Sequence, residues 1–211
     1  VEVVDILRDK ADLEFKRDSE ARVAIKKGEL VIAPGVFEMI SAKVADRMGF
    51  DALYMTGYGT VASYLGLPDA GIATYSDMVG RVIAMAGMAR TPLIADADTG
   101  YGNALNVIRT VQDFEAAGLA AIHIEDQVGA KRCGHRPNKE IVTKQEMVDR
   151  IKAGVDGRHD DDFVIMARTD AHAVEGQQAA LDRAAAYVEA GADMIFAEAL
   201  ASLDEYREFT A

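Results

Sequence analysis

The sequence contains one cysteine and no tryptophan, and proline is rare. Among its 211 residues there are one cysteine, Cys133, and four prolines. A single cysteine excludes an intrachain disulfide framework and a cysteine-rich zinc site within this sequence. No apolar run approaches the roughly 20 residues of a membrane span. The first residues show neither the basic start nor the apolar centre of a signal peptide. We therefore expect a cytoplasmic protein.

Positive charge is also scarce. The 23 lysines and arginines against 35 acidic residues give a net charge of −12. A surface this acidic argues against nucleic acid and against an anionic membrane as main partners. The length suits one sizeable core or at most two small domains. We expect a single domain over residues 1–211, with C-terminal strands missing from it and a charged, helical segment at residues 1–28.

Six short apolar runs predict β-strands. Each run is nearly continuous rather than alternating, which is typical of parallel strands that are buried on both faces. The predicted strands are residues 30–33, 52–55, 93–95, 120–124, 163–167 and 194–197. Helical spacing of apolar residues lies between and after them, at residues 37–48, 74–89, 106–117, 144–155, 177–190 and 202–209.

Alternating strands and helices leave two architectures, a doubly wound open sheet or a (β/α)₈ barrel. Ionisable residues follow nearly every predicted strand, and in a barrel such strand ends meet at one mouth. No Gly-x-Gly-x-x-Gly motif follows the first predicted strand, which weakens the case for a dinucleotide-binding fold. We therefore predict a (β/α)₈ TIM barrel, of which this chain holds about six βα units.

Two carboxylates, Asp96 and Asp98, stand two residues apart at the end of the third predicted strand. They are expected to point to the same side, where like charges need a counter-ion. A hard divalent cation such as Mg²⁺ would supply it. Glu125 adds a carboxylate after the next strand. The alternatives are that the aspartates cap a helix or hold a loop, and that Glu125 braces Arg168.

A polar segment at residues 131–137 contains Lys131, Cys133 and His135. Neighbouring cations lower the pKa of a thiol, so Cys133 is a candidate general acid or base. Cysteine is usually a buried apolar residue, but nothing apolar flanks Cys133. The length and polarity of the segment suggest a mobile lid.

Three further features complete the candidate site. Arg168 ends a buried strand and is suited to clamp a carboxylate, or else to pair with Glu125 or Glu198. The segment from Thr56 to Gly59 contains two glycines that expose backbone N–H groups to an anion, and Tyr54 before it is a candidate proton carrier. Together these groups suit a small, multiply charged 2-oxo or 2-hydroxy carboxylate.

At residues 96–102, 129–139 and 166–170 the chain resembles the isocitrate lyase and phosphoenolpyruvate mutase superfamily. The resemblance runs from about residue 32 to the end, and the cysteine loop is similar to that of the branch acting on 2-methylisocitrate. It implies a (β/α)₈ barrel, a homotetramer built as a dimer of dimers, and Mg²⁺, with Mn²⁺ as a substitute. It also implies retro-Claisen cleavage of a carbon–carbon bond.

The resemblance also implies roles for single residues. The metal would be held by Asp96 and Asp98, with Glu125 and Asp69 near it. Cys133 would protonate the departing enolate and Tyr54 would be the base, with Lys131 and His135 in the same catalytic loop. The substrate would contact Thr56, Gly57, Tyr58, Gly134, Arg168 and Glu198. Tyr58 is a departure, because the 2-methylisocitrate branch has Ser-Gly-Gly where this chain has Thr56-Gly57-Tyr58.

The expected activity is cleavage of 2-methylisocitrate into pyruvate and succinate, or of a related 2-hydroxy polycarboxylate. The partner is thus a small di- or tricarboxylate. Two alternatives use the same scaffold, an oxaloacetate C–C hydrolase or decarboxylase and an alkylmalate lyase. A third, from another class, is a non-catalytic carboxylate-binding protein. The presence of Asp96, Asp98, Cys133 and Arg168 together argues against the third.

Overall fold

Six parallel strands form one sheet in the computed structural model, which describes residues 30–210. The strands are β1 Gly35–Val36, β2 Leu53–Met55, β3 Leu93–Asp96, β4 Ala121–Glu125, β5 Val164–Thr169 and β6 Met194–Ala197. Each strand pairs with the next one in the sequence, so the order across the sheet is β1-β2-β3-β4-β5-β6. This sequential order is that of a (β/α) barrel and differs from the reversing order of a dinucleotide-binding sheet. The predicted partial barrel is therefore confirmed.

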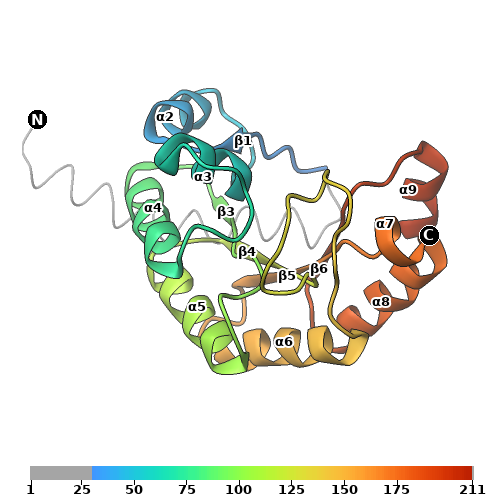
Figure 1. Ribbon diagram of the computed structural model, residues 1–211. Coiled ribbons are helices and arrows are strands. Elements are labelled where there is room, and N and C mark those ends of the chain that lie inside the picture. Colours follow the sequence, from blue (N-terminus) through green and yellow to red (C-terminus); the bar gives the residue numbers. More distant parts are fainter. Residues whose placement is uncertain (1–29, 211) are drawn as a thin grey trace, which may run out of the picture.

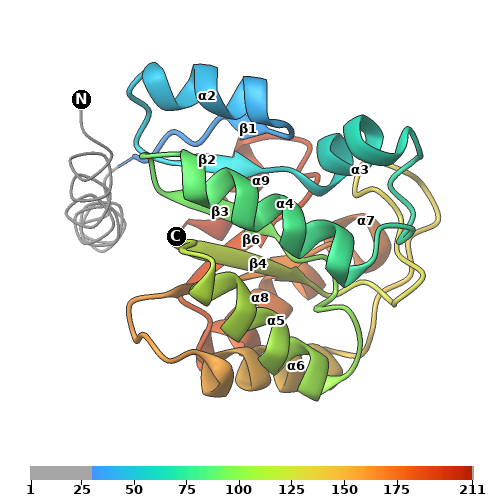
Figure 2. The same cartoon turned by 90° about the vertical axis from the view of Figure 1, so that its left-hand side faces the viewer.

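The helices follow the strands in the expected alternation. They are α2 Met39–Arg47, α3 Gly57–Leu65, α4 Tyr75–Met88, α5 Ala104–Ala116, α6 Lys144–Gly157, α7 His172–Glu175, α8 Gln177–Glu189 and α9 Leu203–Phe209. In Figure 1, α2, α4, α5, α6 and α8 follow one another around the outside of the sheet. Figure 2 shows α3, α7 and the long loop between β4 and α6 together at one end, where the strands terminate.

The main core lies between the sheet and the outer helices. Phe114 of α5 and Met147 and Ile151 of α6 are fully buried there against strand residues such as Ile122. Truncating a buried aromatic such as Phe114 to alanine typically costs about 3–5 kcal/mol. Residues of the opposite face form a smaller cluster of Ala52, Ile94, Ala121 and Val164. This second cluster lies on the inner face of the sheet, and Tyr54 packs against it.

Five of the six predicted strands are confirmed to within about two residues, but the first prediction is wrong. The apolar run at 30–33 forms no strand, and β1 begins at Gly35. Leu30 is 86% exposed and Ile32 is 54% exposed, while Val31 and Ala33 pack, half-buried, against the smaller cluster. Pairing starts one residue later, where the Pro34 carbonyl accepts the Tyr54 N–H at 3.0 Å. The predicted segment at 1–28 lies outside the described residues.

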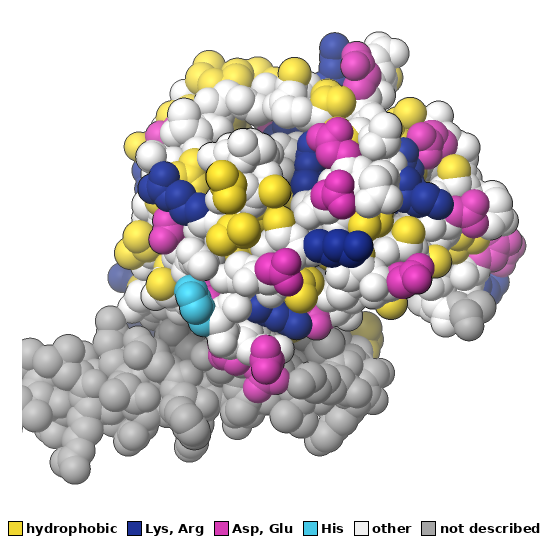
Figure 3. All heavy atoms as spheres, turned by 90° about the horizontal axis from the view of Figure 1, so that it is seen from below, with side chains coloured by type: hydrophobic (Ala, Val, Ile, Leu, Met, Phe, Trp, Pro, Cys, Tyr) yellow, Lys and Arg dark blue, Asp and Glu magenta, His cyan; other side chains and the backbone are white. Residues whose placement is uncertain are grey.

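Two helices, α3 and α7, were not predicted. Helix α3 begins within a segment whose two glycines suggest a loop, because glycine is a poor helix former. Thr56 caps it by accepting the Gly59 N–H at 3.0 Å, and Gly66 ends it with a φ of 66°. Within residues 30–210 no helix is long and apolar enough to cross a membrane. Figure 3 shows acidic and basic side chains interspersed with apolar ones on the outer face.

Candidate active site

Strand alternation gathers the predicted residues on the inner face of the sheet. Successive side chains of a strand point to opposite faces. On β2–β5 the residues of one set pack toward the outer helices: Leu53, Met55, Leu93, Ala95, Ile122, Ile124, Ile165 and Ala167. The other set therefore faces inward, and it includes Tyr54, Asp96, His123, Glu125 and Arg168. The register of β3 with β4 places Asp96 beside His123, and that of β4 with β5 places Glu125 beside Arg168.

The predicted metal-binding carboxylates are held by hydrogen bonds and by Lys131. Asp96 accepts the N–H of Asp98 at 2.8 Å and that of Gly57 at 3.2 Å. The ammonium of Lys131 contacts Asp98 and lies 2.8 Å from Asp69. Lys131 thus supplies the positive charge that we expected, from the sequence, to come from a metal ion. Burial and the charge of Asp96 nevertheless raise the pKa of Asp98 to about 6.

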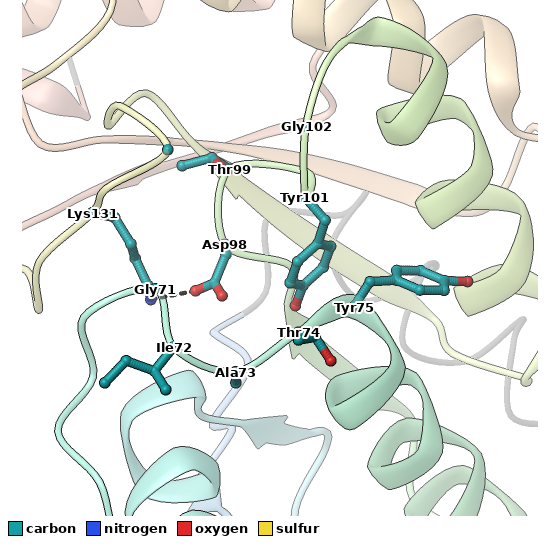
Figure 4. A pocket seen from close by; sticks show the side chains of 11 residues that line it. Gly71, Ile72, Ala73, Thr74, Tyr75, Asp98, Thr99, Tyr101, Gly102 and Lys131 are labelled. Carbon is teal, nitrogen blue, oxygen red and sulfur yellow. Dashed lines mark ion pairs between the residues drawn. The ribbon is translucent and has the colours of Figure 1, made fainter.

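The pair of Lys131 and Asp98 borders a cavity of about 430 Å³ (Figure 4). In this view Lys131 reaches Asp98 from the β4–α6 loop, while Tyr101 and Tyr75 stand on the other side of Asp98. The hydroxyl of Tyr101 is buried and has no hydrogen-bond partner among the described residues. A polar ligand or water entering here would meet a carboxylate, an ammonium and a free hydroxyl.

No three acidic, histidine or cysteine side chains converge as a metal site within residues 30–210. The donor set nevertheless has the chemistry of a Mg²⁺ site, since carboxylate oxygens are its preferred protein ligands. Glu125 is 1% exposed, and its Oε1 atom is buried without a hydrogen-bond partner in the described chain. Burial raises the pKa of Glu125 well above its usual value. The residues present therefore fit a hard cation, once Lys131 withdraws from Asp98.

Arg168 is surrounded by three carboxylates. Its nitrogens lie 3.3 Å from Glu125, 3.1 Å from Asp170 and 3.2 Å from Glu198. Burial opposes the charge of Asp170, yet Arg168 and Lys139 hold the pKa of Asp170 below its usual value. The guanidinium also lies over the ring of Phe196, at 5.6 Å from its centroid. The structural ion pair predicted as an alternative is present, and it points Arg168 into the mouth.

Tyr54 and His123 form a short hydrogen bond beside Asp96. The Tyr54 hydroxyl and His123 Nε2 are 2.6 Å apart, and Nε2 is 3.5 Å from Asp96 Oδ1. Burial lowers the pKa of His123 to about 4, so the ring is neutral near pH 7. Burial and the charge of Asp96 raise the pKa of Tyr54 above its usual value. We therefore expect a protonated phenol near pH 7.

The β4–α6 loop carries Cys133 over the strand ends. Cys133 is half-buried, and the next residue, Gly134, is packed against Arg168 and Glu198. A Cβ atom at Gly134 would lie 2.3 Å from an Arg168 nitrogen and 2.7 Å from the Glu198 carboxyl carbon. Only glycine allows this approach. His135 Nε2 lies 3.4 Å from Glu198, although the His135 side chain is 80% exposed.

A second hollow of about 340 Å³ opens beside the cysteine. Tyr58 and Asp69 line it together with Arg132 and Cys133 of the β4–α6 loop. Tyr58 is 56% exposed, so its ring is free to contact a molecule that enters. Tyr58, the residue that departs from the 2-methylisocitrate branch, thus lines the same hollow as Cys133. A binding role for Tyr58 stays a prediction.

The backbone donors predicted at Thr56 and Gly57 are already used. The Thr56 N–H donates to the Val36 carbonyl at 3.0 Å, as part of the pairing of β1 with β2. The Gly57 N–H donates to Asp96, and a Cβ atom there would lie 2.4 Å from that carboxylate. These two residues orient Asp96 and the start of α3. Their contact with a substrate stays a prediction.

Sequence reasoning did not single out four residues that the structure places at the site: His123, Gln127, Lys139 and Asp170. The sequence could have indicated His123, because residues two apart in a strand point to the same face and His123 is two residues before Glu125. Asp170 stands two residues after Arg168 and pairs with it. Gln127 and Lys139 carry no local signal, because their contacts arise only when the loop folds back on itself.

Comparison with known proteins places the chain in a family. A model described as phosphoenolpyruvate phosphomutase matches residues 23–211. The chain is 55% identical to the 2-methylisocitrate lyase of Salmonella typhimurium, over 89% of this chain and 64% of the relative. It is 54% identical to the 2,3-dimethylmalate lyase of Eubacterium barkeri, over 85% of this chain and 62% of the relative. The chain thus spans less than two thirds of the length of these relatives.

A solved structure of phosphonopyruvate hydrolase in complex with oxalate and Mg²⁺ has the same arrangement of elements. It aligns with a TM-score of 0.82 and 37% identity, over 92% of this chain and 67% of that protein. The family match covers most of the chain, and both relatives are more than half identical to it. The superfamily predicted from the sequence is therefore confirmed, and the chain belongs to the phosphoenolpyruvate phosphomutase family.

Proposed function

We propose that the protein is a Mg²⁺-dependent carbon–carbon lyase that cleaves 2-methylisocitrate into pyruvate and succinate. The observation that carries the proposal is the position of the Cys133 loop over the mouth. Gly134, the residue after Cys133, packs on Arg168 and Glu198, so the backbone of the cysteine loop lies against the guanidinium that we expect to bind a carboxylate. The 55% identical relative carries the name of this activity.

Two carboxylates of this chain, Asp96 and Asp98, would hold the metal, with Glu125 near it. When bound, Mg²⁺ supplies a positive charge that stabilises the negative charge developing on the substrate oxygens. Lys131 now contacts Asp98 and has to give up that contact when the ion binds. Glu125 Oε1 has no hydrogen-bond partner among residues 30–210, so this oxygen would be available to support the bound ion.

Arg168 binds and orients a substrate carboxylate. A guanidinium presents two parallel N–H donors to a carboxylate, and this geometry fixes the orientation of the bound group. Arg168 already faces three acidic groups, so it remains positively charged and the mouth has an excess of negative charge. A substrate carboxylate would replace Glu198 as a partner of Arg168.

Tyr54 and Cys133 move the two protons of the reaction. Tyr54 takes the proton of the substrate 2-hydroxyl while its own proton passes to the neutral ring of His123, 2.6 Å away. The C–C bond then breaks, the hydroxyl carbon becomes the carbonyl of pyruvate, and the bonding electrons remain on the succinate carbon. Cys133 protonates that carbon. Asp96, at 3.5 Å from His123, stabilises the protonated ring.

A substrate panel tests the proposed function. The full-length protein with Mg²⁺ is given 2-methylisocitrate, isocitrate, 2,3-dimethylmalate and oxaloacetate, and release of pyruvate, glyoxylate, oxalate or CO₂ is followed. We expect pyruvate from 2-methylisocitrate and none when Mg²⁺ is removed by a chelator. Activity on oxaloacetate alone would replace the proposal by the hydrolase or decarboxylase. Inactivity on all four, with Mg²⁺ bound, would support a non-catalytic carboxylate-binding protein.

A second candidate, cleavage of 2,3-dimethylmalate, is favoured by one observation. Tyr58 lines the hollow next to Cys133, where the 2-methylisocitrate branch has a glycine. A large aromatic ring there narrows the space for a third carboxylate and favours a dicarboxylate with apolar substituents. The 54% identity to a 2,3-dimethylmalate lyase agrees with this candidate. The panel separates the two, since the better substrate has the higher kcat/KM.

We also propose that the protein works in the cytoplasm as a homotetramer, with a small carboxylate as its substrate. The resemblance to the superfamily supports the tetramer. In the described residues β1 and β6 are the edges of the sheet, so a complete barrel needs further strands. Light scattering of the purified full-length protein would measure its mass in solution, and a monomer or dimer would contradict the proposed assembly.

A further inference from the structure

The loop that carries Cys133 is braced on both sides of the cysteine. Its base is closed by an antiparallel bridge between Gln127 and Ile141. The side-chain amide of Gln127 accepts from the Arg132 N–H and donates to the Arg132 carbonyl, both at 2.9 Å. On the other side, the ammonium of Lys139 donates to the Gly134 carbonyl at 2.5 Å. Both neighbours of Cys133 in the sequence are thus held by side chains of the same loop.

Lys139 is a buried cation with one carboxylate partner in the part of the chain that the structure describes. Its side chain is 2% exposed, and its Nζ atom lies 2.7 Å from Asp170 Oδ1, which is fully buried. Lysine is almost never buried without a partner, because a charge loses its hydration inside a protein. An apolar side chain of the same length would pack here without that loss. We therefore attribute the charge at this position to the two groups that the ammonium contacts, the Gly134 carbonyl and Asp170.

Asp170 joins this cation to the substrate-binding guanidinium. One carboxylate oxygen accepts from Lys139, and the other accepts from Arg168 Nε at 3.1 Å. The chain of contacts runs from the Gly134 carbonyl through Lys139 and Asp170 to Arg168. The loop and the end of β5 are held in one arrangement by these groups, in addition to the direct packing of Gly134 on Arg168.

We infer that Lys139 is a positioning residue, whose ammonium holds the Cys133–Gly134 backbone in register with Arg168 so that thiol and guanidinium address the same substrate. The inference rests on the proposed function, since it takes Cys133 and Arg168 as the reacting and binding groups. When a substrate carboxylate engages Arg168, Asp170 keeps Lys139 as a second cation. The loop therefore stays in place while Arg168 changes partner.

Alkylation of the single cysteine tests the inference without any substrate. The full-length Lys139→Met variant is compared with wild type and with Lys144→Met. That control loses the same charge from an exposed position at the start of α6. The proteins are alkylated with neutral iodoacetamide at a series of pH values. The limiting rate, reached at high pH where the thiol is fully ionised, measures how accessible Cys133 is and does not depend on the pKa of its thiol. We expect a limiting rate about tenfold faster in Lys139→Met only, since the loop opens locally when a brace is lost.

Turnover gives the second readout. Loss of position at the reacting thiol lowers kcat by about 10–100-fold and leaves KM within about threefold of wild type. An unchanged alkylation rate together with unchanged kcat, even with lower stability in urea, would make Lys139 merely structural and overturn the inference. The two proposals can also fail separately. If the wild-type protein is inactive on every substrate while Lys139→Met is alkylated faster, the proposed function is contradicted and the positioning of Cys133 by Lys139 is supported.

A second pair of variants covers the case in which Lys139→Met does not fold. Lys139→Arg keeps the positive charge and its pairing with Asp170, but its planar head cannot reproduce both contacts of one ammonium nitrogen. Its limiting alkylation rate is expected to lie above that of Lys144→Arg by at least about twofold and, where Lys139→Met folds, below the rate of that variant. Equal rates for the two arginine variants would overturn the inference.

Discussion

The ammonium of Lys131 contacts the carboxylate of Asp98, where the sequence predicts a metal ion. Both side chains are nearly buried, at 3% and 10% exposure, and Asp69 is a second partner of the lysine at 2.8 Å. A lysine of the chain itself therefore offsets part of the negative charge of the mouth. Because Lys131 belongs to the loop of Cys133, entry of a metal ion and the position of that loop are linked.

Replacing Lys131 by methionine is expected to strengthen Mg²⁺ binding. The variant leaves Asp98 and Asp69 buried without their cation, which is destabilising by up to about 3–5 kcal/mol. A divalent ion then restores the balance of charge and meets no competing ammonium. Calorimetry without substrate should give a lower Kd for Mg²⁺ than in wild type, and Mg²⁺ should raise the Tm of the variant more.

The matched control is again Lys144→Met, which should bind Mg²⁺ like wild type. Equal or weaker Mg²⁺ affinity in Lys131→Met would show that Lys131 does not compete with the ion for Asp98.

Replacing Gly134 by alanine is expected to abolish most turnover with little effect on folding. The new Cβ atom would clash with Arg168 at 2.3 Å and with Glu198 at 2.7 Å, so the loop or the guanidinium must move. Misplacement of about 1 Å at a reacting centre costs about 100-fold in rate. Gly129→Ala in the same loop is the control, because its Cβ would meet nothing within 4 Å. Equal turnover of the two variants would remove Gly134 from the site.

Replacing Tyr58 by serine is expected to change substrate preference. The ring lines the hollow of about 340 Å³ beside Cys133, and its removal enlarges that space. The ratio of kcat/KM for 2-methylisocitrate to that for 2,3-dimethylmalate should rise by about tenfold, since a group that fits a pocket contributes about 1–3 kcal/mol. Tyr64→Ser, on the same helix, should leave the ratio unchanged. A ratio unaffected by Tyr58→Ser would show that the ring does not contact the substrate.

Tyr75 gives a pH-dependent contribution to stability. Burial and its hydrogen bond to Asp113 raise the pKa of Tyr75 to about 12, compared with about 10 for a free tyrosine. The folded state thus binds its proton more tightly, so this contribution is present below pH 10 and is lost as the pH rises toward 12. The free energy of unfolding of wild type minus that of Tyr75→Phe should therefore decrease from pH 9 to pH 11.5. A difference that is constant over this range would contradict the raised pKa.

The sequence predicts most of the fold because buried parallel strands are continuous apolar runs. Residues 93–95 and 120–124 match β3 and β4 closely, whereas 30–33 gives no strand and leaves Leu30 and Ile32 exposed. Exposure depends on neighbours that are distant in the sequence, so an apolar run alone cannot report it. Helix α3 is missed for a related reason, since Gly57 serves a close approach to Asp96, and Gly59 one to Thr56 and Phe37, rather than a turn.

The site was predictable where strand ends determine it. Asp96, Glu125 and Arg168 all stand at or next to such ends, and the structure brings them together as expected. The braces of the loop, Gln127 and Lys139, could not be predicted, because each acts on a backbone group five residues away through a contact that only the folded loop creates. The use of the Thr56 and Gly57 N–H groups likewise depends on pairing with β1 and on the position of Asp96.

The most direct test of the proposed lyase is the turnover of Cys133→Ser on 2-methylisocitrate, measured alongside binding of Mg²⁺ and pyruvate. Serine keeps the size and polarity of the thiol but is a far weaker acid. The proposed mechanism predicts that the variant loses nearly all pyruvate release, while it binds Mg²⁺ and pyruvate like wild type. Turnover equal to that of wild type would show that Cys133 does not protonate the departing carbon, and would contradict the mechanism.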